Sequence, residues 1–416
     1  MRKTLLVPLV GLSTFALVLA ACTGLPETSP SQSAVSATST AGAPTEPTVS
    51  APETFTVNVD GDAPTFNAGF LSYFPKELSV HPGDTVDFKL VDSGEPHTVT
   101  LGTLADAGLA AAAAATDPFA PVPELDKLPS LLPEGPGDAN QTAATPCFVD
   151  SGEPPENERC PEAEPPPFTG TQTFYNSGWL GAEDTFSVAL SPDIEPGTYG
   201  FFCLLHGQAM SGEINVVETE TAVKSPEEAA QEGQAQLDEL VAKLQPAVDQ
   251  AIAATADTAL AGTGSPEAQE GLATIFGPED LSIPVGGSVT WTVLGPHTVS
   301  FNAPEDAVGI RVEAPDGSVH INEKSVVPAN SPGQPPPPEP DPNASPPPPP
   351  DPNAPPPPPT VIDAGAWDGT GFRSSGIILS FPPELFAYKQ TFTTAGTYTY
   401  QCLIHPDMEG TVTVGS

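Results

Sequence analysis

Cysteine, histidine, methionine and basic residues are all scarce in this chain. Among 416 residues there are five cysteines, six histidines and three methionines. Only 12 lysines and arginines stand against 53 acidic residues, which gives a formal net charge of −41. This balance excludes proteins that bind nucleic acid or an anionic lipid surface through basic side chains. It is typical of an acidic, solubilised protein surface.

Long apolar runs are also missing beyond the first residues, so no later segment is predicted to cross a bilayer as a helix. The first run follows Arg2 and Lys3 and ends in small residues before Cys22, which is the pattern of an export signal. Because the run is short and interrupted by Pro8, we prefer a cleaved signal peptide over residues 1–21 to an uncleaved membrane helix. The cleavage site resembles the lipobox of bacterial lipoproteins. This resemblance implies that Cys22 is lipidated and holds an extracytoplasmic protein on the outer face of the cell membrane.

Two segments are poor in large apolar residues and cannot bury enough surface to fold. Residues 22–52 are mainly Ser, Thr, Ala and Pro and form a predicted disordered tether. Residues 332–360 carry two Asp-Pro-Asn-Ala repeats between runs of proline, which favour polyproline II. This second segment is either a solvated spacer or an arm that binds a partner, and we favour the spacer.

The cysteines that follow Cys22 divide into two pairs. Cys147 and Cys160 lie close together in a loop rich in proline and glutamate, and an oxidising compartment predicts a disulfide between them. They could instead ligate a metal, but no histidine lies near them in the sequence. Cys203 and Cys402 each begin a Cys-x-x-His motif.

The chain contains an internal duplication, which predicts two related domains. Phe74–Leu101 and Phe276–Phe301 both read as a strand, a glycine-containing turn and a second strand with alternating polarity, and both contain Pro-His-Thr-Val. Each repeat closes with two further strands joined by the Cys-x-x-His loop. We therefore predict all-β domains over residues 53–218 and 265–416, with a sandwich as the expected arrangement.

Residues 219–264, between the domains, are predicted to form a helical linker. Ser225 to Glu228 has the pattern of a capping box with proline in the first turn, and apolar residues follow at helical spacing. We expect the helix to be bent or broken at Pro246 and its apolar stripe to pack on one of the domains. A coiled coil is disfavoured because the stretch is short.

A methionine follows each Cys-x-x-His motif, and a Pro-His-Thr-Val histidine stands at a nearly equal distance upstream in the two repeats. One thiolate, two imidazoles and one thioether form the ligand set of a blue-copper site, which suits both oxidation states of copper. Core packing explains the pattern poorly, because these residues account for every methionine after Met1 and for four of the six histidines. The predicted ligands are His97, Cys203, His206 and Met210 in the first domain and His297, Cys402, His405 and Met408 in the second.

Both repeats resemble the cupredoxins, the family of plastocyanin, amicyanin and pseudoazurin. The resemblance covers the β cores and implies two Greek-key β-sandwiches, each with one type 1 copper ion at one end. It also implies that His206 and His405 carry electrons through exposed imidazole edges. The departure from the family is the long insertion in each repeat between the first histidine and the cysteine, including an alanine-rich segment over Leu104–Thr116. Such insertions alter solvent access if they cover the copper end.

The sequence thus predicts a membrane-anchored, extracytoplasmic protein with two type 1 copper sites. It would exchange single electrons with redox partner proteins at the membrane surface. The alternative is a copper-binding protein for storage, delivery or tolerance. A multicopper oxidase or copper nitrite reductase needs further histidines, and only His81 and His320 are left, so we expect no enzyme.

Overall fold

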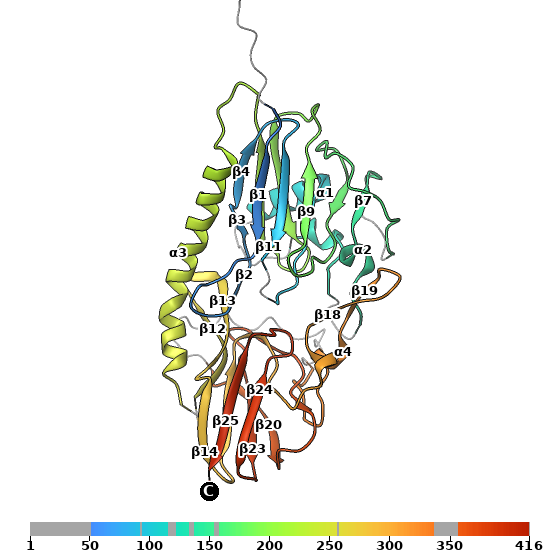
Figure 1. The fold of residues 1–416 in the computed structure, drawn as a ribbon. Coiled ribbons are helices and arrows are strands. Elements are labelled where there is room, and N and C mark those ends of the chain that lie inside the picture. Colours follow the sequence, from blue (N-terminus) through green and yellow to red (C-terminus); the bar gives the residue numbers. More distant parts are fainter. Residues whose placement is uncertain are drawn as a thin grey trace, which may run out of the picture. The chain divides into compact units, whose positions relative to one another are not determined.

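The computed structural model describes most of the chain that follows the predicted tether, and Val49–Ser416 forms one compact unit. The described residues are 51–91, 94–114, 122–132, 137–153, 158–255, 258–336 and 357–415. The predicted signal peptide, Cys22, nearly all of the tether and most of the proline-rich insertion lie outside them. Figure 1 shows the elements of the described part in the order of the chain.

Two sheets of strands make up the first β-sandwich, with the strand orders β3-β1-β5-β9 and β4-β11-β10-β6-β8-β7. Buried and exposed residues alternate along its strands, because successive side chains point to opposite faces. The chain crosses between the sheets: β1 pairs in parallel with β5, while β4, which lies between them in sequence, pairs with β11 in the other sheet. The strands are β1 (Thr54–Val59), β3 (Tyr73–Phe74), β4 (Glu77–Val80), β5 (Thr85–Leu90), β6 (Thr100–Leu101), β7 (Cys147–Val149), β8 (Phe174–Asn176), β9 (Thr185–Ala189), β10 (Gly197–Cys203) and β11 (Gly207–Val216).

The second sandwich repeats this plan, with the strand orders β2-β13-β12-β15-β23-β20 and β14-β25-β24-β17-β21. The parallel pairs β12·β15 and β14·β25 correspond to β1·β5 and β4·β11 of the first. Its strands are β12 (Ala259–Ser265), β13 (Ala268–Gly277), β14 (Asp280–Pro284), β15 (Ser288–Val293), β17 (Ser300–Phe301), β20 (Thr360–Trp367), β21 (Arg373–Ser374), β23 (Phe386–Phe392), β24 (Gly396–Gln401) and β25 (Glu409–Gly415). The short pair β16 (Gly295–His297) and β22 (Ile378–Ser380) lies beside them.

Three aromatic residues pack together in the core of each sandwich. Tyr73, Phe88 and Phe201 pack edge to face in the first sandwich. In the second, Phe301 and Tyr400 pack around Trp291, and all three are buried. Burying one such ring stabilises the fold by about 1.5–3 kcal/mol. The predicted fold class, two β-sandwiches with a helix between them, is confirmed.

The two sandwiches share a strand. β2 (Ala68–Phe70) comes from the first domain in sequence but pairs antiparallel with β13 and forms the edge of a second-domain sheet. Residue 259, the start of β12, lies inside the range that we assigned to the linker, so the second sandwich begins earlier in the chain than its predicted start at residue 265. The other predicted domain limits stay predictions. The β2·β13 pairing ties the two sandwiches together through backbone hydrogen bonds.

Helix α3 (Pro226–Ile252) fills the rest of the linker and contacts strands of both sandwiches, namely β1, β3, β12 and β13 (Figure 1). The capping box at Ser225 and Glu228 is present as predicted. We expected α3 to be bent or broken at Pro246, and a break is wrong, because the helix continues through this residue. The buried side chains of Leu244 and Val248, on either side of the proline, hold both halves on β13, which offsets the hydrogen bond that proline cannot donate.

The insertions contribute elements of their own. The alanine-rich segment forms α1 (Thr103–Ala114), which packs on β10, and is followed by η1 (Leu125–Lys127) and α2 (Gln141–Ala144). The predicted disulfide between Cys147 and Cys160 is confirmed. In the second domain the corresponding elements are η2 (Glu305–Ala307), β18 (Arg311–Glu313), β19 (Val319–Ile321) and α4 (Glu323–Val326). No helix in the described part of the chain is both long and apolar enough to cross a membrane.

Candidate metal centres

The first centre is built where β10 meets β11. Cys203 is the last residue of β10, a register shift between Phe202 and Cys203 turns the chain, and His206 lies in the tight connection. Gly207 begins β11 with a positive φ of 58°, which suits glycine at this turn. Met210 follows on β11 and is fully buried. One short loop therefore brings three of the predicted ligands to the end of two paired strands.

His97 reaches the same place from the loop between β5 and β6. One nitrogen of His97, one of His206 and the Cys203 sulfur all lie within 4.8 Å of one another. The Nδ1 atoms of both histidines are buried and have no hydrogen-bond partner among the described residues. Two buried nitrogen lone pairs beside a buried thiol fit a metal ion, because burying such groups without a partner costs free energy.

A carboxylate that the sequence did not single out fixes the His97 ring. His97 Nε2 donates to Oδ2 of Asp60 at 2.9 Å, and both side chains are fully buried. Burial alone would lower the pKa of His97, but the hydrogen bond of Asp60 and the nearby charges of Asp60 and Cys203 outweigh it and raise the pKa to about 10. With Nε2 committed to Asp60, Nδ1 is the nitrogen left to bind a metal.

The second centre shows its donor atoms converging on one point. The Nδ1 atoms of His297 and His405 are 3.1 Å apart, and they lie 4.0 and 3.4 Å from the Cys402 sulfur. A flat three-coordinate centre with bonds of about 2.0 Å to nitrogen and about 2.3 Å to sulfur needs N···N and N···S separations of about 3.5 and 3.7 Å. The three atoms therefore already form a triangle of the size that a metal requires.

Both thiols are poised as thiolates. Burial alone would raise the pKa of Cys203, but the charges of His206 and His97 beside it hold the pKa well below its usual value. Burial is likewise outweighed at Cys402, whose pKa is lowered by His405 and His297. A thiolate is the form of cysteine that binds a metal, so both centres favour metal binding near neutral pH.

The two histidines of the second centre have unlike surroundings. The His297 ring lies against Gly262, where an added Cβ would stand 2.2 Å from its Nε2, and that nitrogen has no hydrogen-bond partner among the described residues. The pKa of His297 is lowered, and burial is the main cause. His405 instead donates through Nε2 to Oε1 of Glu95, a residue of the first sandwich, at 2.9 Å.

Glu95 is itself buried, which alone would raise its pKa. The hydrogen bond and charge of His405, with the charges of His206 and His97, lower the pKa of Glu95 to about 2 instead. Burial would also lower the pKa of His405, but Cys402 and Glu95 raise it to about 10. The Glu95 carboxylate therefore lies among ligands of both centres.

A second set of residues, repeated in both domains, holds the cysteine sulfurs. The backbone N–H of Thr98 donates to Cys203 Sγ at 3.4 Å, and that of Thr298 donates to Cys402 Sγ at 3.3 Å. Their hydroxyls accept from the residues after the cysteines, Leu204 and Leu403. Ser177 and Ser375 accept from the valines that follow these threonines. Pro-His-Thr-Val thus positions the thiolate and the histidine together. The Ser-Gly pair that directly follows both β8 and β21 is a repeated signal that the sequence analysis missed.

The structure thus brings together the two histidines and the cysteine of each predicted group, and Met210 on β11 and Met408 before β25 are both buried. The two spare histidines hydrogen-bond elsewhere: His81 with the Thr221 carbonyl, and His320 with Asp138. The expectation of two exposed imidazole edges is wrong for His405, which is 2% exposed. Residues of the first sandwich cover it, whereas His206 is only half-buried.

The fold and the centres together define a mainly β protein with two buried His–Cys–His groups. No family model and no curated protein matches the chain. Solved structures of copper proteins align with part of it. Dithionite-reduced auracyanin from Roseiflexus castenholzii is 19% identical, with 40% of this chain and 97% of auracyanin covered and a TM-score of 0.22.

Two further solved structures align with a similar share of this chain. Auracyanin A from Chloroflexus aurantiacus, a "blue" copper protein, is 18% identical over 40% of this chain and 100% of its own, with a TM-score of 0.20. Pseudoazurin from Methylobacterium extorquens is 15% identical over 45% of this chain and 97% of its own, with a TM-score of 0.17.

Proposed function

We propose that the protein is a two-domain cupredoxin that holds one copper ion in each sandwich and exchanges single electrons with redox partners. The observation that carries this proposal is the duplicated buried group of one thiolate and two imidazoles, with a buried methionine a few residues further along the chain. When bound, copper supplies one-electron chemistry, and this ligand set serves both of its oxidation states. The chain's part is to hold the ligands still and to exclude water.

Hydrogen bonds to the ligands perform this part. Asp60 and Glu95 fix the outer nitrogens of His97 and His405, and backbone N–H groups at Thr98 and Thr298 point at the sulfurs. Outer groups of this kind orient the ligands and tune the metal. Little of the protein then has to rearrange when one electron arrives or leaves.

Burial favours electron transfer over the alternative of storage or delivery. Both cysteine sulfurs and both methionines are at most 1% exposed, so a metal ion would leave only after the loops open. We also propose that the protein is not an enzyme. In the described residues, the clusters of three or more possible metal ligands are the two groups above, and no third cluster that could form a catalytic copper site is found there. His206, the less buried of the two second histidines, is the proposed point of contact with a partner.

For location, we propose a lipid anchor on Cys22 and an extracytoplasmic site at the membrane surface. The disulfide between Cys147 and Cys160 supports an oxidising compartment. Metabolic labelling with a fatty acid tests the anchor. Label should appear on the wild-type protein and be lost in Cys22→Ala, with release from the membrane fraction, and label that survives the substitution would reject this part of the proposal.

Copper stoichiometry, visible absorption and EPR on the full chain test the function, alongside Cys203→Ser and Cys402→Ser. We expect two copper ions per chain, an intense blue band, and the loss of one centre with each substitution. One copper ion in the wild-type protein, or colour that survives both substitutions, would show that at least one group does not bind copper in this way.

A further inference from the structure

Glu95 completes the second centre from outside the second domain. It lies two residues before His97, in the first sandwich, yet its carboxylate accepts the hydrogen bond of His405 Nε2, with side-chain exposures of 8% and 3% for Glu95 and His405. The equivalent position in the second repeat is Gly295, which precedes Pro296 and His297 as Glu95 precedes Pro96 and His97. The duplicated motif therefore carries a carboxylate in one copy only.

The approach of the two domains at this point is close and specific. Gly94 has a positive φ of 80°, and an added Cβ would lie 3.0 Å from the Ile404 carbonyl and 3.3 Å from His405 Cα. The Asn67 side chain donates to the Asp407 carbonyl at 2.7 Å. The first sandwich thus contacts the ligand loop of the second on both sides of His405, and the β2·β13 pairing fixes the approach.

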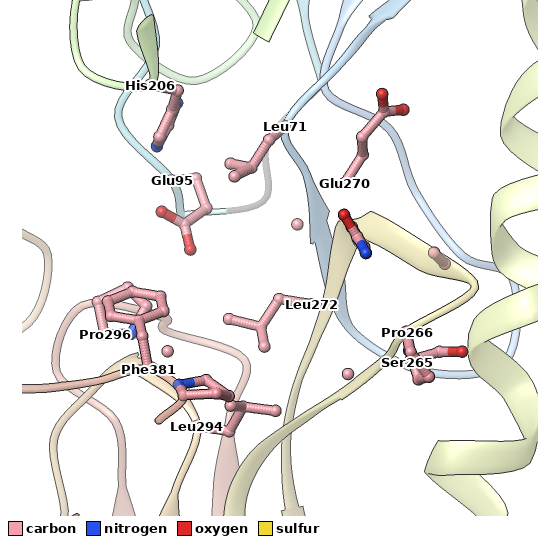
Figure 2. Close-up of a pocket in the computed structure, with 17 residues that line it drawn as sticks. Leu71, Glu95, His206, Ser265, Pro266, Glu270, Leu272, Leu294, Pro296 and Phe381 are labelled. Carbon is pink, nitrogen blue, oxygen red and sulfur yellow. The ribbon is translucent and has the colours of Figure 1, made fainter. Parts of the chain in front are cut away.

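Glu95 also borders the first centre. Glu95 and His206 line one apolar pocket of about 460 Å³, together with Leu272 and Phe381 of the second sandwich. Figure 2 shows Glu95 and His206 beside each other on its wall. A larger cavity of about 1010 Å³ is lined by His206, Glu95 and His405 together. The second histidines of the two centres therefore border one cavity together with this carboxylate, which is bonded to His405.

We propose that Glu95 is a positioning residue for the second metal centre, supplied by the first domain, so that the second centre is complete only when the sandwiches are docked. The proposal rests on the function proposed above. Glu95 holds the Nε2 proton of His405 and leaves Nδ1 for the metal, and it covers the imidazole edge of this centre. Redox partners would then contact the chain at His206, so they approach the first centre and not the second.

The test replaces Glu95 by Gln in a Cys203→Ser background, which leaves only the second centre. Glu270→Gln is the matched control: Glu270 lines the same apolar pocket and pairs with Lys76 across the two sandwiches at 2.9 Å, but no hydrogen bond to a histidine is found for it in the described part of the chain. We expect Glu95→Gln to weaken copper binding about 10- to 100-fold and to change the EPR spectrum of the second centre. Glu270→Gln should leave both unchanged.

A measurement on the metal-free protein separates this proposal from the proposed function. Nitrogen-15 NMR of the His405 ring in the metal-free full chain should show a proton held on Nε2, and Glu95→Gln should shift that signal while Glu270→Gln does not. This outcome would support the positioning role even if the second centre failed to bind copper. An unchanged His405 signal in Glu95→Gln would overturn the positioning role, and so would equal changes in Glu95→Gln and Glu270→Gln. If Glu95→Gln does not fold, Glu95→Asp takes its place in the same measurement.

Discussion

The two candidate metal centres have the same predicted ligands, but different residues hold those ligands in place. In the first, Asp60 of the same sandwich holds the outer nitrogen of His97, and His206 stays half-buried. In the second, the outer nitrogen of His297 lies against glycine without a hydrogen-bond partner among the described residues, and His405 is held by Glu95 of the other sandwich. The first centre is self-contained, whereas the second depends on the contact between the domains.

This difference shows how a duplicated domain can acquire two roles without changing its ligands. Outer-sphere groups adjust affinity and potential, so moving a carboxylate from one histidine to the other alters a centre while its donor atoms stay the same. Each support can be removed separately, and the predictions that follow compare the two centres in this way.

The largest effect should come from Gly262→Ala. Gly262 has a φ of 79° at a register shift in β12, and an added Cβ would stand 2.2 Å from both His297 Nε2 and the Leu294 carbonyl. Left-handed strain and overpacking together should cost about 2–5 kcal/mol of unfolding free energy and displace His297. Chemical unfolding and copper binding in a Cys203→Ser background measure both effects.

Gly264→Ala is the control for this prediction. It lies on the same strand, and its added Cβ would meet its nearest neighbour, Leu294 Cδ2, at an ordinary 3.4 Å. We expect it to change stability and copper binding little. Equal losses in the two variants would show that β12 tolerates no added methyl group, and that His297 is not the cause.

Removing the disulfide should weaken the first domain next. Cys147 and Cys160 are 13 residues apart, and a crosslink that closes such a loop stabilises a protein by about 3 kcal/mol through the unfolded chain. The double variant Cys147→Ala/Cys160→Ala should lose this amount in thermal unfolding of the metal-free protein. A reductant should destabilise the wild type by a similar amount and leave the double variant unchanged; a wild type indifferent to reductant would contradict the prediction.

Asp60→Asn should weaken the first centre alone. An amide that turns its NH2 group to His97 Nε2 favours the proton on Nδ1, where it blocks the metal, so copper affinity should fall about 10- to 100-fold in a Cys402→Ser background. Asp84→Asn is matched, because Asp84 is a buried loop carboxylate of the same sandwich that accepts backbone N–H groups from Glu53 and His81. Equal losses in both variants would assign the effect to folding.

The sequence predicted the two His–Cys–His groups because they are scarce residues at duplicated spacings, and it predicted the sandwiches because polarity alternates along their strands. It did not predict Asp60 or Glu95 as supports. Acidic residues are abundant in this chain, and neither of these two recurs in the other repeat. Gly295 in place of Glu95 was a visible difference, but its meaning depends on the docking of the two domains.

The shared strand and the unbroken helix have the same physical origin. β2 is only three residues long, and its three residues are all buried, so alternation could not assign it to a sheet. In an isolated helix, a proline at this position would be expected to break the helix, because it removes one backbone hydrogen bond. Packing of Leu244 and Val248 against β13 holds both halves of α3 in place. Contacts between segments that are distant in the sequence determine both features, and a pattern within a short stretch of sequence carries no information about such contacts.

The smallest expected effect concerns Asp106, on the insertion helix α1 that packs against the cysteine strand of the first sandwich. Asp106 Oδ1 accepts from the Gly200 N–H at 2.7 Å. Burial raises its pKa to about 6, although this hydrogen bond opposes the shift. Between its unfolded pKa near 3.8 and about pH 6 the folded state therefore holds more protons than the unfolded state, and stability falls as the pH rises through this window.

Asp106→Asn removes this titration while keeping an oxygen that can accept from Gly200. Because the residue is only half-buried, the variant should be more stable than the wild type by about 1–2 kcal/mol above pH 6, with the difference vanishing below pH 4. Urea unfolding of the metal-free protein across this pH range measures the difference. Asp238→Asn, on the exposed face of α3, should show no such pH-dependent gain, and a gain at Asp106 that is constant with pH would mean that burial of its charge is not the cause.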